Sequence, residues 1–192
     1  MNARPSSVGQ QLHHSNCLGC GALNNYSFRI PSTFNEQKGE VEFSYQMRRE
    51  HEGAPGHAHG GALALILDEA QGVLCHHLGH FVMTDGFSIK YFKATPLYKD
   101  LKITAWLTSA RSKRLYTRAR ISLPSGDPVT GRGDEVLVES KIKWYIIPER
   151  LLERRFSAGG HPGILLKDFL EPNRARAKEI RRRLRAEKKT VG

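Results

Sequence analysis

The fold of this chain is decided by the stretch HAHGGALALILDEA, which covers residues 57–70. Small residues open it, and the sequence then becomes almost entirely apolar, which is typical of a helix that is buried on all sides. One acid, Asp68, stands in the middle of the apolar run. A carboxylate in an apolar environment is costly unless it is paired or has a chemical task. Asp68 is therefore the first candidate functional residue.

The apolar stretch predicts a helix from about Gly60 to Leu78, with Gly79 as its C-terminal stop. Around it, apolar and polar residues alternate with a period of two, which predicts strands. The predicted strands cover residues 26–30, 41–47, 81–94, 101–108, 115–123 and 136–147. Short links between successive strands favour antiparallel pairing, and one buried helix can cover a face of such a sheet. The predicted fold class is α+β, with an antiparallel sheet wrapped around one long central helix.

The length of 192 residues favours one domain with an extension. We expect a flexible lead over residues 1–15, a folded domain over 16–148, and an extension with a basic helix over 149–192. The formal net charge is +11, and nine lysines and arginines lie between residues 174 and 189. A basic helix of this kind can contact nucleic acid or a membrane surface, although a solvated helix is the simpler interpretation.

The cysteines and the hydropathy indicate a cytoplasmic protein. Three cysteines do not make a disulfide framework in a chain of this length. No apolar run approaches the roughly 18 residues of a membrane span, and residues 1–11 do not resemble a secretory signal. Cys17 and Cys20 have the spacing of a zinc knuckle, to which His13 or His14 could contribute, but a structural zinc site normally has four protein ligands, and no second cysteine pair follows. We interpret residues 17–21 as a glycine-rich turn with buried thiols and predict no metal.

The motif His59-Gly60-Gly61, followed on the same helix by Asp68 and Glu69, resembles the signature of PaaI-like hotdog-fold acyl-CoA thioesterases. The resemblance covers roughly residues 16–147. It also includes Cys17–Gly21, Pro55-Gly56, Thr84, Ser88–Tyr91 and Pro96-Leu97. It implies the hotdog fold, an antiparallel sheet around a long helix, assembled as dimers and often as tetramers. It implies hydrolysis of acyl-CoA thioesters, and we expect no cofactor beyond the coenzyme A that is part of the substrate.

The residue types suit this chemistry. Backbone N–H groups at Gly60 and Gly61, at the helix N-terminus, can hold a polarised carbonyl oxygen, and glycine lets a substrate approach closely. Asp68 is a candidate general base or nucleophile, and Thr84 is a candidate to orient the water or to bind the acid. Two interpretations of His59 stay open, a cap of the helix or a contact with the substrate.

The spacing along the helix predicts a shared site. His59 and Asp68 are nine residues apart, or about 13 Å along a helix axis, which is too far for both to grip one carbonyl. Two antiparallel copies of the helix would bring Asp68 of one near Gly61 of the other. We therefore predict a homodimer with active sites shared across an isologous interface, as the resemblance also implies, and leave a tetramer open.

Coenzyme A carries phosphates, and Lys90, Lys113 and Arg114 are the candidate residues for binding it. By resemblance, residues 111–114 match a Gly-Arg-Lys-type segment that lies along the coenzyme. Ser112 replaces the glycine of that segment, so that the backbone would approach the coenzyme less closely.

The loop before the helix departs from the family. Some relatives have an Asn there that helps to hold the carbonyl, whereas this chain has Glu52-Gly53-Ala54. Two alternatives stay open: His51 or His57 substitutes for the Asn, or the backbone N–H groups hold the carbonyl alone. Asp85 adds a second acid, which would perturb Asp68 through like-charge repulsion. Exposed or interfacial positions are expected for Glu69 and Gln71, and surface positions for His76, His77 and His80.

The leading interpretation is an acyl-CoA thioesterase. The alternative is a non-catalytic acyl-CoA-binding or interaction module, whose basic tail docks on nucleic acid or a membrane. A hotdog hydratase or dehydratase is a third interpretation, and the position and type of the acid favour hydrolysis over it.

Overall fold

The computed structural model describes residues 16–31, 33–125, 133–148, 150–151, 177–179, 182–183 and 186. The elements are β1 (Thr33–Asn35), β2 (Glu40–Gln46), a 3-10 turn η1 (Arg49–His51), α1 (Gly60–His77), β3 (Val82–Tyr91), β4 (Asp100–Arg111), β5 (Arg114–Leu123) and β6 (Glu135–Ile146). The predicted central helix and five of the six predicted strands are confirmed, with bounds that shift by a few residues. Within the described residues, no helix has the length and apolar character needed to cross a membrane.

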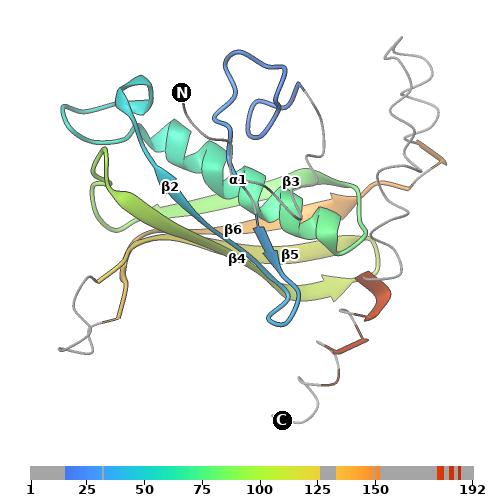
Figure 1. Cartoon of the computed structure of the whole chain (residues 1–192). Coiled ribbons are helices and arrows are strands. Elements are labelled where there is room, and N and C mark those ends of the chain that lie inside the picture. Colours follow the sequence, from blue (N-terminus) through green and yellow to red (C-terminus); the bar gives the residue numbers. More distant parts are fainter. Residues whose placement is uncertain are drawn as a thin grey trace.

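The six strands form one antiparallel sheet in the order β1-β2-β4-β5-β6-β3. Figure 1 shows the sheet curving beneath α1, which lies across its concave face. The helix makes its main contacts with β4, β5 and β2. This is the α+β arrangement that the sequence predicted. Because β3 ends the strand order, its outer edge has no partner within the described part of the chain.

The core lies between α1 and the sheet. It joins the apolar face of the helix to inward residues of four strands, and its fully buried members include Ile66, Leu67, Ala70, Leu74, Val41, Ile103, Ala105, Ala119, Ile121 and Val138. The helix ends as predicted, because Gly79 takes a positive φ of 75° and donates its N–H to the His76 carbonyl at 2.8 Å.

The predicted strand at residues 26–30 is wrong. The N–H groups of Phe28 and Ile30 donate to the carbonyls of Leu18 and Gly19, at 2.9 and 3.0 Å, and not to a sheet. Arg29 between them has a φ of 54°, which a regular strand does not allow. The segment instead braces the turn at residues 17–21, and the first strand is β1.

Three side chains expected at the surface or at an interface are buried, namely Gln71 at 0%, His76 at 7% and His77 at 4% exposure. The His77 ring stacks on Phe34 at 4.6 Å between centroids. These three residues lie in the second half of α1, and their burial shows that the sheet covers the last turns of the helix as well as its middle.

Gln71 is buried because every polar atom of its amide is engaged. Its Nε2 donates to the Leu67 carbonyl at 3.0 Å and to Ser140 Oγ at 2.8 Å. Its Oε1 accepts from Thr117 Oγ1 at 2.7 Å, and Thr117 in turn accepts from Trp144 Nε1 at 2.7 Å. These bonds tie α1 to β5 and β6 beneath the candidate site.

The predicted lead at 1–15 and most of the predicted extension at 149–192 lie outside the described residues, as does most of the predicted basic helix. Among the described tail residues, Ala177 is fully buried, and the Arg183 guanidinium donates to the Glu36 carbonyl in the β1–β2 turn. The domain bounds at residues 16 and 148 stay a prediction.

Candidate functional site

The N-terminus of α1 is capped by a side chain. His59, in extended conformation at φ −65° and ψ 136°, is the N-cap residue, and its Nδ1 accepts the Gly61 N–H at 2.9 Å. The structure thus shows His59 as a cap of the helix, and its contact with the substrate stays a prediction. The imidazole thus occupies one of the backbone donors expected to hold a carbonyl oxygen.

The same end of the helix is held from β3 by a residue that the sequence did not single out. Tyr91 donates its hydroxyl to the Gly60 carbonyl at 2.9 Å. A Cβ at Gly60 would lie 3.4 Å from the Tyr91 hydroxyl, and one at Gly61 would lie 3.1 Å from His59 Nδ1. Glycine at both positions therefore lets neighbouring groups approach the first turn closely. The sequence did show that apolar and polar residues alternate along β3, and this alternation could have indicated that Tyr91 faces the helix.

The loop before the helix is braced by His51, whose carbonyl accepts the His59 N–H at 2.8 Å. The His51 ring stacks on Phe28 at 4.4 Å, and its Nδ1 accepts the Arg48 N–H at 3.0 Å. Burial lowers the pKa of His51. His57, the other candidate to replace the family's Asn, is exposed and lies with Nδ1 3.0 Å from the Pro55 carbonyl.

Asp68 and Thr84 are brought together. Thr84 Oγ1, on β3, donates to Asp68 Oδ1 at 3.1 Å. Asp68 is half-buried, and its pKa is raised above the ordinary value, chiefly by burial and further by Glu69 and Cys17, while the Thr84 bond opposes that rise. A raised pKa moves a carboxylate toward the range in which it can accept a proton during catalysis.

A cavity of about 340 Å³ opens beside this pair. Its lining includes Asp68, Thr84, Val73, Val82, His76 and Trp144. The acid thus has a hollow beside it whose wall combines apolar and aromatic side chains with polar ones, among them Glu69 and His80, as a small-molecule site requires.

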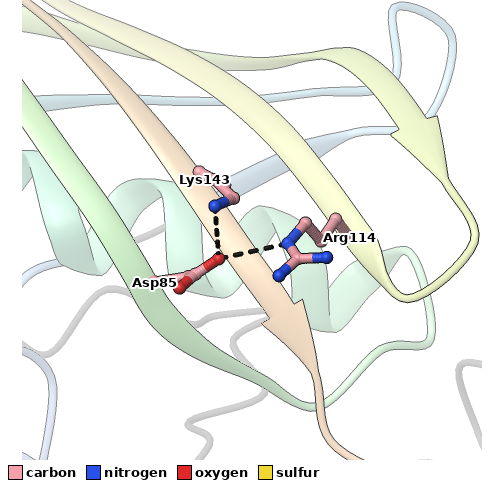
Figure 2. Close-up of polar contacts among 3 residues, drawn as sticks. All are labelled: Asp85, Arg114 and Lys143. Atoms are coloured by element: carbon pink, nitrogen blue, oxygen red, sulfur yellow. Dashed lines mark hydrogen bonds and ion pairs between the residues drawn. The ribbon is translucent and has the colours of Figure 1, made fainter.

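Asp85 does not act on Asp68. Figure 2 shows its carboxylate on β3 facing Lys143 of β6 and Arg114 of β5. Asp85 Oδ2 lies 2.8 Å from Lys143 Nζ and 3.2 Å from Arg114 Nε, and these two cations lower the pKa of Asp85. The expected like-charge perturbation of Asp68 comes from Glu69 instead.

The reason lies in a β-bulge. The register of β3 against β6 shifts between Thr84 and Gly86. The extra residue lets Thr84 and Tyr91, seven positions apart, both contact α1, although strict alternation would point them to opposite faces. Asp85, at the bulge, turns its carboxylate to the other side.

The candidate coenzyme-binding residues Lys90, Lys113 and Arg114 are not among the residues that line the cavity beside Asp68. Lys90 pairs in register with Glu139, and its ammonium lies 4.9 Å from the centroid of the Phe92 ring. Lys113 lies in the hairpin between β4 and β5, next to Arg114, which is engaged by Asp85.

Ser112, in the same hairpin, has a positive φ of 46°. That conformation favours glycine, the residue that the resemblance implied at this position.

One group in the described residues has donors suited to a metal ion, namely Cys17, Cys20 and Glu69, whose ligand atoms lie within 4.8 Å of one another. The sequence showed the two thiols but not the carboxylate, because Glu69 follows 49 residues after Cys20. None of the three cysteines forms a disulfide.

Comparisons with known proteins agree with this fold. Residues 55–130 match the family model of the Thioesterase superfamily. Acyl-coenzyme A thioesterase THEM4 of Rattus norvegicus is 28% identical over 94 residues, which are 49% of this chain and 40% of that protein. The chain thus matches well under half of the length of this curated relative.

Two solved structures show the same architecture. Protein RHA08564, a thioesterase superfamily protein, is similar with a TM-score of 0.55 and 27% identity over 66% of this chain and 60% of that one. A hypothetical thioesterase from Streptococcus pneumoniae TIGR4, solved with coenzyme A, has a TM-score of 0.51 and 21% identity, and the similarity covers 57% of this chain and 80% of that one. The helix motif, the hotdog sheet and the family model agree, and the chain is therefore similar in residues 55–130 to the thioesterase superfamily and in its fold to hotdog thioesterases.

Proposed function

We propose that this protein hydrolyses acyl-CoA thioesters to a free acid and coenzyme A. The observation that carries the proposal is the half-buried Asp68, oriented by Thr84 and open to a cavity, on the helix whose motif marks the family. The similarity to THEM4, an acyl-coenzyme A thioesterase, supports the substrate class.

Asp68 activates the attacking group. As general base, its carboxylate takes a proton from a water while the water oxygen bonds to the thioester carbon; as nucleophile, it attacks that carbon itself. In both routes the carbonyl oxygen becomes an oxyanion, and its collapse breaks the carbon–sulfur bond and releases the coenzyme thiolate. The general-base route gives the free acid directly, whereas the nucleophilic route leaves an anhydride between the acyl group and Asp68, which a water then hydrolyses to the free acid and the regenerated carboxylate. Thr84 holds the carboxylate in one orientation during the attack.

The N-terminus of α1 holds the carbonyl oxygen, with the Gly60 and Gly61 N–H groups as donors. Because His59 Nδ1 accepts the Gly61 N–H, this role requires the imidazole to turn away when substrate binds. His59 therefore acts as a cap that the substrate displaces.

Two copies of the chain form each site. The roughly 13 Å that separates His59 from Asp68 along α1 argues for a carbonyl held by one copy and a water activated by the other. Strand β3 supports this assembly, because it ends the sheet and its neighbourhood exposes large apolar side chains. These are Met83 at 55%, Phe87 at 37%, Tyr91 at 49% and Phe92 at 48% exposure. Pairing β3 with its copy would cover both the edge and these side chains. A tetramer would need a second contact.

Coenzyme A is bound through Lys90, Lys113 and Arg114, which offer positive charge to its phosphates. The coenzyme A held by the similar Streptococcus pneumoniae protein supports a coenzyme site on this fold. We place the reaction in the cytoplasm, because three cysteines in a chain of this length do not make a disulfide framework.

A panel of acyl-CoA thioesters, from acetyl to long-chain and aryl, tests the function. Release of coenzyme A is followed by loss of the thioester absorbance, and binding of each substrate is measured in parallel by calorimetry. The proposal predicts turnover of at least one class. Binding without turnover across the panel would contradict it and would favour the alternative, a non-catalytic acyl-CoA-binding module.

A further inference from the structure

Two thiols and a carboxylate converge beside the middle of α1, next to the cavity at Asp68, and the proposed reaction gives none of the three a chemical step. The Sγ atoms of Cys17 and Cys20 and one carboxylate oxygen of Glu69 lie within 4.8 Å of one another. Cys20 is 3% exposed, and the other two side chains are half-buried. We propose that this cluster binds one zinc ion through the two cysteine sulfurs and the Glu69 carboxylate.

The distances suit a tetrahedral ion. With Zn–S near 2.3 Å and Zn–O near 2.0–2.2 Å, a sulfur and an oxygen on one zinc lie about 3.5 Å apart. Cys17 Sγ and Glu69 Oε2 lie 3.4 Å apart. The ion can therefore enter between these two atoms with little movement of either side chain.

The backbone around the thiols has the form of a metal-binding knuckle. The Gly19 N–H donates to Cys17 Sγ at 3.3 Å, and the Gly21 N–H donates to the Cys17 carbonyl at 2.9 Å. An N–H bond to sulfur favours the thiolate, the form that ligates a metal. The turn is itself fixed, because Phe28 and Ile30 donate to its carbonyls.

Gly19 allows the carboxylate to reach the thiols. A Cβ at this position would lie 2.4 Å from Glu69 Oε2 and 2.5 Å from its Cδ, closer than any contact that side chains tolerate. A residue with a side chain would displace either the turn or Glu69. The glycine between the two cysteines is therefore explained by the third ligand, which comes from a distant part of the chain.

The donor set selects the ion. Two thiolates are soft ligands, which zinc and cobalt accept and magnesium and calcium do not. A thiol now donates to the carboxylate, and zinc would replace the protons of both thiols as it binds. Within the described residues the group has three ligands, and the fourth position of the tetrahedron is open to a water or to a further side chain of the protein. The ion would fasten the turn at residues 17–21 to α1, whether or not the protein is a thioesterase.

Cobalt and zinc titrations of the reduced, chelator-treated full chain test the site. We expect one Co²⁺ per chain, with the charge-transfer absorption of a cobalt–thiolate bond, and displacement of cobalt by one equivalent of Zn²⁺. Cys17→Ser and Cys20→Ser should abolish the thiolate band, and Glu69→Gln should weaken zinc binding by at least roughly 10- to 100-fold. Cys75→Ala and Glu50→Gln, which alter a thiol and an acid elsewhere, should bind as the parent does.

Absence of a cobalt–thiolate band in the parent chain would overturn the proposal. A band that survives in both Cys17→Ser and Cys20→Ser would also overturn it, as would zinc affinity unchanged in Glu69→Gln. If a cysteine variant fails to fold, the number of Co²⁺ ions bound per parent chain and the zinc affinity of Glu69→Gln still test the proposal. Neither measurement depends on turnover of acyl-CoA, so failure of the proposed function would leave this result intact.

Discussion

Thr84 Oγ1 donates a hydrogen bond to Asp68 Oδ1 at 3.1 Å, and this bond joins the edge strand β3 to the central helix α1. It brings together two residues that lie 16 positions apart in the sequence. Because β3 also contacts the helix N-terminus through Tyr91, the strand holds both halves of the proposed site.

Replacing Thr84 with Val removes the donor and keeps the shape. A hydrogen bond to a charged group contributes about 1.5–3 kcal/mol, so kcat/KM should fall by roughly 10- to 100-fold. Thr84→Ser keeps the hydroxyl and should retain most of the activity. Equal activity in the Val and Ser variants, measured by coenzyme A release, would show that the bond has no part in turnover.

Replacing Ser112 with Gly should stabilise the protein. Ser112 has a positive φ of 46° in the two-residue loop between β4 and β5. Glycine avoids the backbone strain of this conformation, which costs a serine about 1–2 kcal/mol, but it also gives the unfolded chain more conformational entropy to lose on folding. We expect a net gain of about 0.5–1 kcal/mol in the free energy of unfolding. Ser109→Gly, within β4, should instead destabilise. A lower midpoint of denaturant unfolding for Ser112→Gly would contradict this.

Replacing Gln71 with Leu should destabilise the core. The change leaves Thr117 and Ser140 buried without their amide partner, at a cost of about 1–3 kcal/mol. Gln46→Leu removes an exposed bond to Asp100 and should change stability by less than about 0.5 kcal/mol. Urea unfolding compares the two variants, and equal midpoints would refute the role of the buried network.

Stability should fall in mild acid because of His51. Burial lowers the pKa of His51 below its ordinary 6.5, with Arg48 lowering it further and Glu50 opposing. The folded protein therefore binds fewer protons than the unfolded chain, and stability is lost as the pH falls from about 6.5 toward the folded pKa. His51→Gln should flatten this part of the curve. Parallel stability–pH curves for the parent and variant, from urea unfolding at several pH values, would contradict the prediction.

Local sequence patterns were sufficient to predict the helix and strands whose apolar residues recur regularly. The apolar run after Gly61 predicted α1, and the alternation of residues predicted β2 to β6. The strand at 26–30 failed because Arg29 adopts a positive φ, which no residue pattern there signals. The expectation of an exposed or interfacial Gln71 was wrong because its hydrogen-bond partners come from β5 and β6. These partners lie far from Gln71 in the sequence, and the fold brings them to its amide in the core.

The candidate site was predictable only in part. The helix motif indicated Asp68 and the first turn, and the family resemblance indicated Thr84. The alternation of residues along β3 could not predict which face of the sheet Thr84 points to, because the bulge at Asp85 shifts the alternation by one residue. Nor could the spacing of Cys17 and Cys20 indicate a third ligand, since Glu69 approaches them only after α1 is placed against the turn.

The central claim is that Asp68 activates the attack on the thioester. The most direct measurement is kcat/KM for acyl-CoA hydrolysis by Asp68→Asn, beside Asp100→Asn, which makes the same change at the start of β4. We expect a loss of roughly 100-fold or more for Asp68→Asn, as for removal of a general base, and parental activity for Asp100→Asn. Folded Asp68→Asn protein that hydrolyses the substrate as fast as the parent would contradict the account.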